Sequence, residues 1–330
     1  MTTLLAQIAP QRSTQYAELA NALASHELAL SPLGAVITES APVTLGGQAY
    51  LKCELTAELE ASHLHELGLL ATTSAYFDFY DQLGDHPGPL LRPIETDFRP
   101  QLPLDLVEAR RYRGKTNEMF THFLCNVARF SSGYAHERWD RLRVLDPLAG
   151  GGTTLFTALV LGADAAGVEK DAKDVESTAT FLKQYVREKG IACRIQEDRL
   201  KKVGKRWQFT IGKETTQRCI LANGDTAQSG ELLVGIKKAH LIVTDLPYGV
   251  QHQGQLAGLL SQGLPVWTSL LLDHGALVFS WDATRFPRDE MIAVVEANSP
   301  LKVLSDPPYD QLAHRVDRVI KQRDVLVARR

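Results

Sequence analysis

An alternation of short apolar runs with amphipathic stretches of helical length dominates the sequence from residue 143 onward. Such an alternation is typical of β-α-β units, in which helices join parallel strands and cover the sheet. The expected strands are residues 143–148, 165–169, 193–196, 241–246, 276–281, 302–304 and 325–328. The expected helices are residues 154–161, 175–189, 256–272 and 288–297. This pattern predicts a doubly wound α/β domain with seven strands and with ligands at the carboxyl ends of those strands.

The first hundred residues lack this alternation and predict a separate, small α+β unit. Helical patterns cover residues 15–26 and 56–69, and residues 48–53 form a short apolar run. Residues 84–103 contain five prolines, which predicts a linker or a wrapped connection rather than regular structure. We therefore expect an N-terminal domain over residues 1–103 and an α/β domain over residues 104–330.

Charge is distributed unevenly between these parts. Residues 1–110 contain five Lys and Arg against fourteen Asp and Glu, whereas the rest of the chain contains 31 against 25. Because phosphate contacts need basic side chains, a nucleic acid is expected to bind the second part. The acidic first part is expected to shape the substrate cleft, to bind a protein partner or to mediate self-association.

Cysteine usage and hydropathy predict a cytoplasmic protein. The four cysteines are far apart and form no C-x-x-C pair, which favours neither a metal site nor a disulfide framework. The first residues lack a basic segment followed by an apolar core, and no apolar run approaches the ~20 residues that cross a bilayer. We expect reduced cysteines, no metal and no membrane association.

The strongest local signal is the run RVLDPLAGGGTTL at residues 143–155, in which an apolar strand leads into glycines and then a helix. Glycines allow the backbone to turn tightly and to approach a ligand, and the start of a helix offers free N–H groups. The next strand ends at Glu169, whose carboxylate is suited to accepting hydrogen bonds from ribose hydroxyls. This combination predicts a nucleoside cofactor pocket. Its expected contacts are Asp146, Pro147, Ala149, Gly150, Gly152, Thr153, Thr154, Glu169 and Lys170.

The alternative ligand is a nicotinamide dinucleotide. That site would need a glycine at Leu155, and the Asp146 carboxylate would repel a pyrophosphate. The same carboxylate suits the cationic amino acid part of S-adenosylmethionine, which carries no phosphate. A glycine-rich turn without any ligand is the structural alternative.

A third cofactor contact is predicted in the run ILANGD at residues 220–225. An acid after a strand can accept a hydrogen bond from an adenine amino group, so Asn223 and Asp225 are the candidates. Asn-Gly-Asp is also an ordinary turn sequence, and that alternative stays open.

The run IVTDLPYG at residues 242–249 ends another apolar strand and predicts a catalytic loop. An exocyclic amine of a base is a poor nucleophile because its lone pair is delocalised into the ring. The Asp245 carboxylate and the Leu246 carbonyl are expected to localise that pair by accepting the amine hydrogens. Tyr248 is expected to stack on the base, and Pro247 to stiffen the loop so that nitrogen, methyl carbon and sulfur lie in line. The pattern predicts direct methyl transfer without a covalent enzyme intermediate.

Together, D-L-P-Y-G, D-P-x-A-G-G-G-T-T and G-V-E resemble the putative RNA methylase family, whose nearest relatives are the THUMP-associated guanine-N2 methyltransferases of tRNA. The resemblance covers roughly residues 112–328 and begins with Y-R-G-K-T-N at residues 112–117. It implies a Rossmann-like class I methyltransferase domain, S-adenosylmethionine as cofactor, a tRNA substrate and cofactor contacts from Thr116 and Asn117. Leu246, where proline is commoner, favours guanine N2 over adenine N6. The first hundred residues match no THUMP domain.

A second copy of the catalytic motif, DPPY, lies at residues 306–309. No glycine-rich loop precedes it, and it falls in the expected hairpin between the last two strands. We therefore expect a turn there and assign the chemistry to Asp245.

Basic residues gather before the first motif and in an insertion at residues 199–213, where Trp207 and Phe209 lie among them. A basic, aromatic hairpin can follow a phosphate backbone and stack a base, although charged runs are usually solvated surface. The candidate substrate contacts are Arg111, Arg113, Lys115, Lys205 and Arg206.

Three classes of function fit these features. An RNA guanine-N2 methyltransferase is favoured, a DNA or small-molecule amine methyltransferase is the first alternative, and a catalytically silent cofactor-binding subunit is the second. Asp245 and Tyr248 argue against the silent subunit. The basic stretches favour nucleic acid over a small amine, and RNA is favoured over DNA.

Overall fold

The computed structural model describes residues 2–10, 18–112, 114–201, 203–247, 253–316 and 321–330. Two predicted site residues, Arg113 and Tyr248, lie outside these ranges. The chain divides into an N-terminal unit, Met1–Arg99 with Asp306–Arg323, and an α/β unit, Pro100–Ser305 with Asp324–Arg330. The second DPPY motif thus belongs to the N-terminal unit, although it is distant from it in sequence.

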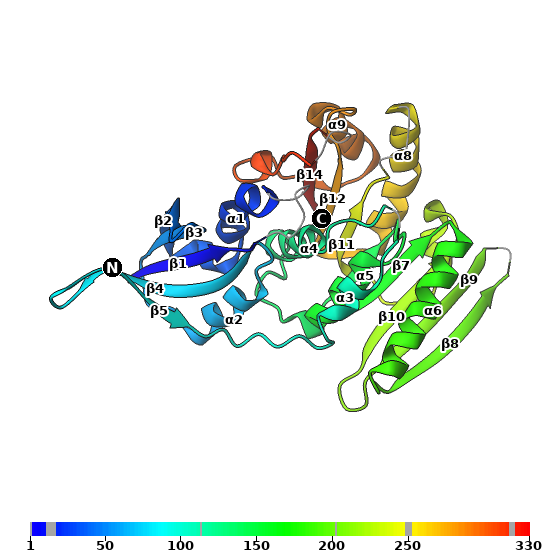
Figure 1. The fold of residues 1–330 in the computed structure, drawn as a ribbon. Coiled ribbons are helices and arrows are strands. Elements are labelled where there is room, and N and C mark those ends of the chain that lie inside the picture. The colour runs from blue at the N-terminus through cyan, green and yellow to red at the C-terminus, as the bar shows by residue number, and fades with distance from the viewer. Residues whose placement is uncertain (1, 11–17, 113, 202, 248–252, 317–320) are drawn as a thin grey trace. The chain divides into compact units, whose positions relative to one another are not determined.

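The N-terminal unit contains a five-stranded antiparallel sheet in the order β2-β3-β1-β4-β5 (Figure 1). The strands are β1 (Thr2–Ile8), β2 (Ile37–Leu45), β3 (Gln48–Leu55), β4 (Thr73–Leu83) and β5 (His86–Ile94). The helices are α1 (Leu19–Leu30), α2 (Ala61–Leu69) and the 3-10 turns η2 (Pro32–Val36) and η5 (Tyr309–Gln311). The predicted linker over residues 84–103 is wrong for β5. Prolines are tolerated there because β5 is an edge strand, where a missing N–H breaks no inner ladder.

The α/β unit contains a nine-stranded sheet in the order β13-β14-β12-β11-β6-β7-β10-β9-β8. The strands are β6 (Arg143–Asp146), β7 (Asp164–Glu169), β8 (Cys193–Leu200), β9 (Gly204–Ile211), β10 (Gln217–Asn223), β11 (Ala239–Asp245), β12 (Leu271–Asp282), β13 (Lys302–Val303) and β14 (Arg323–Arg329). The strands β12, β11, β6, β7 and β10 are parallel. The order reverses between β6 and β11, which is where a doubly wound sheet binds its ligands.

The predicted Rossmann-like α/β class is confirmed, but the sheet has nine strands instead of seven. Residues 193–196 were expected in the third parallel strand, and they instead begin the edge strand β8 of an antiparallel hairpin with β9. The third parallel strand is β10. The sequence pattern did not reveal the full length of β8, because this strand is mostly exposed and its polar residues do not alternate with apolar ones.

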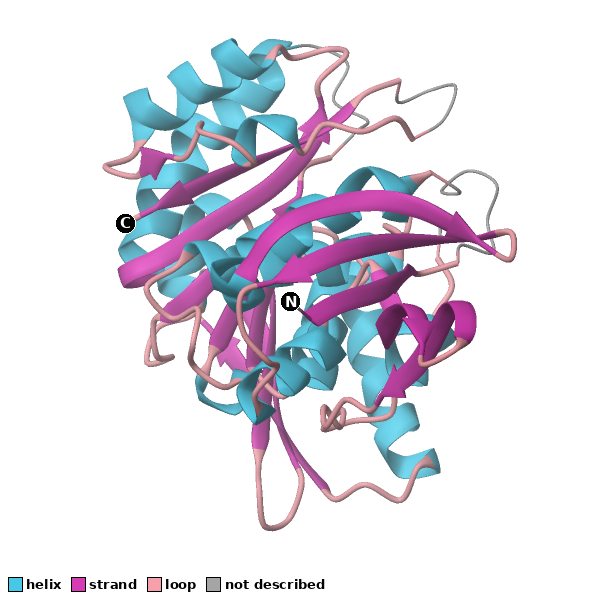
Figure 2. Ribbon diagram, turned by 90° about the vertical axis from the view of Figure 1, so that its left-hand side faces the viewer, coloured by secondary structure: helices cyan, strands magenta, loops and turns pink. Residues whose placement is uncertain are grey.

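Helices cover both faces of this sheet (Figure 2). On one side lie α4 (Glu118–Ser131), α5 (Thr153–Leu161) and α6 (Ala172–Glu188), and on the other α8 (Gln253–Leu270) and α9 (Arg288–Asn298). Shorter elements are α3 (Asp105–Ala109), α7 (Ser229–Leu232), η3 (Trp139–Arg141) and η4 (Thr226–Gln228). Alternate strand residues such as Ile242 and Phe279 pack with Trp267 of α8 and Met291 of α9 in one apolar cluster. No helix among the described residues is long and apolar enough to cross a membrane.

Candidate functional site

Four predicted polar residues lie at the carboxyl ends of neighbouring strands. Asp146 ends β6, Glu169 ends β7, Asn223 ends β10 and Asp245 ends β11. Because these strands are parallel and adjacent, their carboxyl ends share one edge of the sheet. The structure therefore brings the residues of the glycine-rich loop, the second strand and the catalytic loop to one site.

The glycine-rich loop connects β6 to α5 through two left-handed residues, Gly150 with φ 48° and Gly152 with φ 86°. The N–H of Gly150 donates to Oε2 of Glu169 at 2.9 Å, and the N–H of Asp171 donates to Oε1 at 2.7 Å. The Glu169 carboxylate therefore fixes the loop. Since each carboxylate oxygen has more than one acceptor direction, it can also accept hydrogen bonds from a ligand.

Asp146 is almost fully buried, with 3% of its surface exposed. Its Oδ1 accepts from the N–H of Leu148 at 3.0 Å. Burial raises the pKa of Asp146 to about 6, although a hydrogen bond from the Thr154 side chain acts in the opposite direction. A buried carboxylate of this kind is stabilised in its ionised form by an approaching cation.

Tyr112 covers the glycine-rich loop, and it was not among the predicted contacts. Its hydroxyl is hydrogen-bonded to Oγ1 of Thr153, and its ring lies against Gly151. The Arg110 guanidinium lies 5.1 Å from the centre of the Tyr112 ring and donates to the Gly151 carbonyl. An aromatic residue at the start of Y-R-G-K-T-N was the only sequence signal for this cover.

A pocket of about 250 Å³ lies just beyond the carboxyl ends of β6, β7 and β10. Its lining comes from the ends of three strands and from α8: Pro147, Leu148, Glu169, Lys170, Asp225, Thr226, Ala227, Leu259 and Gln262. Apolar and polar groups line it together, as in sites for small molecules. The pocket contains four predicted cofactor contacts, Pro147, Glu169, Lys170 and Asp225.

Asn223 ends β10 close to this pocket, and Asp225 lines the pocket. The Asn223 amide donates to the carbonyls of Glu169 at 3.1 Å and of Lys170 at 3.0 Å. Asp225 caps η4 and accepts from the N–H of Ala227 at 3.0 Å, which lowers the pKa of its carboxyl. Lys170 Nζ also lies 3.3 Å from Asp225 Oδ2. Asp225 therefore acts as an ordinary turn residue, and because it also lines the pocket, a role in ligand binding is compatible with this turn.

The Asp245 carboxylate is held by two hydroxyl groups. Thr116 Oγ1 donates to Oδ2 at 2.6 Å, and Ser280 Oγ, from β12, donates to Oδ1. Thr116 was predicted as a cofactor contact, and the structure places its hydroxyl on the catalytic-loop carboxylate. Asn117, also predicted as a cofactor contact, caps α4, and its side chain accepts from the N–H of Phe120 at 3.0 Å.

The rest of the catalytic loop is described as far as Pro247. Leu246 has a buried side chain, and its N–H donates to the Ser280 carbonyl at 2.9 Å. Pro247 is exposed. This hydrogen bond joins the end of β11 to β12, so the first residues of the catalytic loop have a fixed position.

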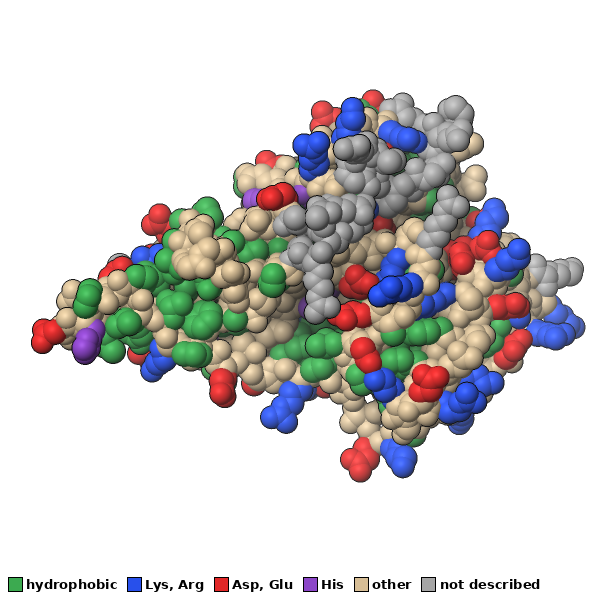
Figure 3. Space-filling view, in the orientation of Figure 1, with side chains coloured by type: hydrophobic (Ala, Val, Ile, Leu, Met, Phe, Trp, Pro, Cys, Tyr) green, Lys and Arg blue, Asp and Glu red, His purple; other side chains and the backbone are tan. Residues whose placement is uncertain are grey.

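Most of the described candidate substrate contacts have partners within the chain. Lys115 donates to the Val107 carbonyl at 2.7 Å and pairs with Glu118, while Arg111 is exposed. Lys205 pairs with Glu176 at 2.9 Å and Arg206 with Asp198 at 2.9 Å. Figure 3 shows basic and acidic side chains interspersed over the part of the view where β8, β9 and α6 lie.

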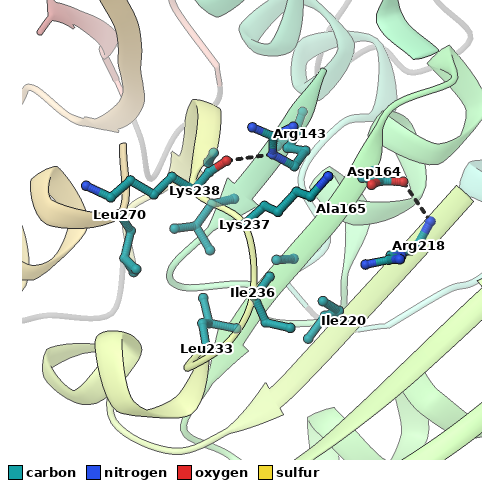
Figure 4. A pocket seen from close by; sticks show the side chains of 14 residues that line it. Arg143, Asp164, Ala165, Arg218, Ile220, Leu233, Ile236, Lys237, Lys238 and Leu270 are labelled. Carbon is teal, nitrogen blue, oxygen red and sulfur yellow. Dashed lines mark hydrogen bonds between the residues drawn. The ribbon is translucent and has the colours of Figure 1, made fainter. Parts of the chain in front are cut away.

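A second, smaller pocket of about 40 Å³ lies toward the amino ends of β6, β7 and β10, where Arg143 is the first residue of β6 and Arg218 the second of β10 (Figure 4). Arg143 Nε donates to the Lys238 carbonyl at 2.6 Å, and Asp164 accepts from the N–H of Arg218 at 2.8 Å. Because parallel sheets bind ligands at the opposite edge, this pocket is not the cofactor site.

Other chemistry-bearing groups do not cluster. Among the described residues, no three His, Cys, Asp or Glu side chains come together as a metal site. The four cysteines are free thiols, and three of them are buried. Asp306 of the second DPPY motif is exposed just before η5, in a turn that begins the segment Asp306–Arg323.

No protein-family model matches the chain, and no curated protein matches its sequence. Among solved structures, TrmN from Thermus thermophilus is 14% identical, with all of both chains covered and a TM-score of 0.47. The rRNA methyltransferase AviRa from Streptomyces viridochromogenes is 15% identical, covering 68% of this chain and 91% of its own, with a TM-score of 0.42. A 16S rRNA N2 methyltransferase from T. thermophilus, RsmC in complex with AdoMet and guanosine, is 14% identical over 90% of this chain and 60% of its own, with a TM-score of 0.39.

Proposed function

We propose that the protein is an S-adenosylmethionine-dependent methyltransferase that modifies an exocyclic amino nitrogen of an RNA base, specifically guanine N2 in tRNA. The observation that carries the proposal is the position of Asp245. It ends β11, next to the strand β6 that leads into the glycine-rich loop, at the reversal point of the sheet. The Asp245 carboxylate, a hydrogen-bond acceptor, and the pocket that we assign to the nucleoside cofactor therefore lie at one edge of the sheet.

The residues at this edge fit the cofactor. The buried Asp146 carboxylate suits the cationic amino acid part, because burial without a cation raises its pKa. Glu169 and Asp225 line the pocket and suit the ribose hydroxyls and the adenine amino group. Gly150 and Gly152 let the loop backbone approach the ligand. The proposed cofactor contacts also include Ala149, Thr153 and Thr154.

The bound cofactor supplies an electrophilic methyl group on sulfur. The protein's part is to orient the amine and to localise its lone pair, which the Asp245 carboxylate and the Leu246 carbonyl do by accepting the amine hydrogens. Asp245 is also the group placed to accept the proton that the nitrogen loses after transfer. Pro247 and Tyr248 complete the proposed catalytic set.

The charge distribution supports RNA as the substrate class. The chain after residue 110 has 31 basic against 25 acidic residues, and Arg111 is an exposed basic candidate near the first motif. The surface of the N-terminal unit favours a different role. Figure 3 shows hydrophobic side chains and few basic ones over this unit, and Leu83 of β4 has 58% of its surface exposed. We assign this unit to a protein partner or to self-association.

The test is transfer of labelled methyl groups by the purified protein to unmodified tRNA, rRNA, duplex DNA and a metabolite pool. Mass spectrometry of digested RNA is expected to detect N2-methylguanosine. Label in DNA or in a small amine would move the substrate to that class. Tight binding of S-adenosylhomocysteine without transfer to any pool would identify a silent subunit, and calorimetric binding of NAD instead would reject the cofactor.

A further inference from the structure

We propose that Thr116 and Ser280 are positioning residues that hold the Asp245 carboxylate in one orientation for the incoming amine. This inference rests on the proposed function and deepens it. Neither hydroxyl needs to touch the substrate or the cofactor. Both act through Asp245, each on a different oxygen of its carboxylate.

Ser280 is positioned by the sheet itself. It is the direct neighbour of Asp245 in the parallel pairing of β11 with β12, and none of its surface is exposed. Its carbonyl accepts from the N–H of Leu246 at 2.9 Å, while its hydroxyl donates to the Asp245 side chain. One residue therefore fixes both the backbone that follows Asp245 and the carboxylate of Asp245.

Thr116 reaches Asp245 from a segment 129 residues away in sequence. It lies between Gly114, which has φ 79°, and Asn117, which caps α4. The cap fixes the start of the helix, and the helix packs on β11 and β12. Thr116 Oγ1 thus approaches Oδ2 from a supported position instead of from a free loop.

Hydroxyl groups are suited to this purpose. A carboxylate has two oxygens with about four acceptor directions, so one hydrogen bond on each oxygen restricts rotation and leaves acceptor capacity for an amine. A Lys or Arg in the same place would supply a full positive charge and would compete more strongly with the amine for the carboxylate. Two hydroxyls orient the group and preserve its ability to accept.

The experiment compares Thr116→Val, which keeps the shape and removes the hydroxyl, with Thr116→Ser, which keeps the hydroxyl. We expect Thr116→Val to lower kcat by about 10- to 100-fold, the size that small misplacements of reacting groups produce. The KM for RNA and the Kd for S-adenosylhomocysteine should change less than about threefold, because positioning acts on the transition state. Thr116→Ser should restore most of kcat.

Ser280→Ala tests the other oxygen, and Thr116→Val/Ser280→Ala should approach the rate of Asp245→Ala. Thr268→Val is the matched control for loss of a buried hydroxyl, since Thr268 Oγ1 donates to the Leu264 carbonyl within α8, away from Asp245. It should leave kcat unchanged. If Ser280→Ala fails to fold, the comparison of Thr116→Val with Thr116→Ser still decides the inference, because Thr116 is partly exposed.

Wild-type kcat in Thr116→Val would overturn the inference while leaving the proposed function intact, provided that Asp245→Ala is inactive. In Thr116→Val, the Kd for S-adenosylhomocysteine could rise by the same factor by which kcat/KM falls. That result would make Thr116 a cofactor contact and would also overturn the inference. An Asp245→Ala variant with full activity, or a wild type that methylates nothing, would remove the proposed function and this inference with it.

Discussion

The ring of Tyr112 lies directly against Gly151, so that a β carbon at position 151 would clash with the Tyr112 ring. The ring cannot easily move away, because its hydroxyl is bonded to Thr153 and Arg110 lies over it. Gly151 is thus required for close packing. Its φ, unlike those of Gly150 and Gly152, does not lie in the left-handed region.

Gly151→Ala is therefore expected to destabilise the fold by ~1–3 kcal/mol, the usual cost of overpacking, and to weaken binding of S-adenosylhomocysteine. Denaturant unfolding and calorimetry measure the two effects. Adding Tyr112→Ala should recover part of the stability, because it removes the clashing ring. Gly258→Ala is the control, since a β carbon there meets nothing within 4 Å. Equal behaviour of both alanine variants would contradict the packing argument.

Asp245→Ala is expected to lower turnover by ~10²–10⁴-fold, as loss of a catalytic acceptor does, while binding of S-adenosylhomocysteine stays nearly unchanged. Asp306→Ala, in the matching motif, should have little effect on turnover, because Asp306 is exposed in a turn of the N-terminal unit. Steady-state rates on an identified RNA decide between them. An inactive Asp306→Ala variant beside an active Asp245→Ala variant would exchange the roles of the two motifs.

Cofactor binding is expected to depend on pH through Asp146, whose pKa burial raises to about 6. A cation stabilises the ionised carboxylate, so affinity for S-adenosylhomocysteine should be constant above that pH and fall about tenfold for each pH unit below it. Calorimetry between pH 5 and 8 measures this, and Asp146→Asn should bind more weakly with no such dependence. A wild-type affinity that is flat down to pH 5 would exclude contact between Asp146 and the cation.

The same shift has a consequence for stability. A folded-state pKa above the ordinary value of 3.8 means that the folded protein binds the proton more tightly than the unfolded chain. The contribution of Asp146 to stability is therefore fully present below about pH 4 and is lost as the pH rises through 6. As the pH rises from about 4 to above 6, the free energy of unfolding of the wild type should therefore fall relative to that of Asp146→Asn. Denaturant titrations at several pH values can measure this difference.

The local part of the site was predictable from the sequence because its signals are contiguous. The strand, glycines and helix of residues 143–155 follow one another, so the loop β6 to α5 and the buried Asp146 could be placed without knowledge of the rest. Glu169 and Asp245 were found in the same way, each at the end of an apolar run.

Contacts that depend on strand register could not be predicted. Ser280 is 35 residues from Asp245, and only the pairing of β11 with β12 brings its hydroxyl to that carboxylate. The prediction divided the hairpin of β8 and β9 into a strand at residues 193–196 and a basic insertion at residues 199–213. Side-chain charge indicates which residues are exposed, but it does not indicate which strands pair. The prolines of β5 likewise concealed an edge strand.

Lys205 and Arg206 are adjacent on β9 and were both predicted to bind RNA, yet their surroundings differ. Arg206 is 11% exposed at its side chain, pairs with Asp198 and donates to the Val234 carbonyl at 2.8 Å. Lys205 is 30% exposed at its side chain, and its Nζ lies 4.2 Å from the centre of the Trp207 ring. Arg206 thus supports the fold, whereas Lys205 lies where it can exchange an acidic partner for a phosphate.

Arg206→Ala is therefore expected to destabilise the protein by ~1.5–3 kcal/mol, because Asp198 and the carbonyls of Leu232 and Val234 lose a charged hydrogen-bond donor, and to leave the salt dependence of RNA binding unchanged. Lys205→Ala should cost less than ~1 kcal/mol of stability and should reduce the salt slope of RNA binding by about one unit, because one phosphate contact is lost. Thermal unfolding and RNA binding at several salt concentrations measure both quantities. An unchanged slope in Lys205→Ala would remove β9 from the RNA-binding surface, and a stable Arg206→Ala variant with weakened RNA binding would reverse the two roles.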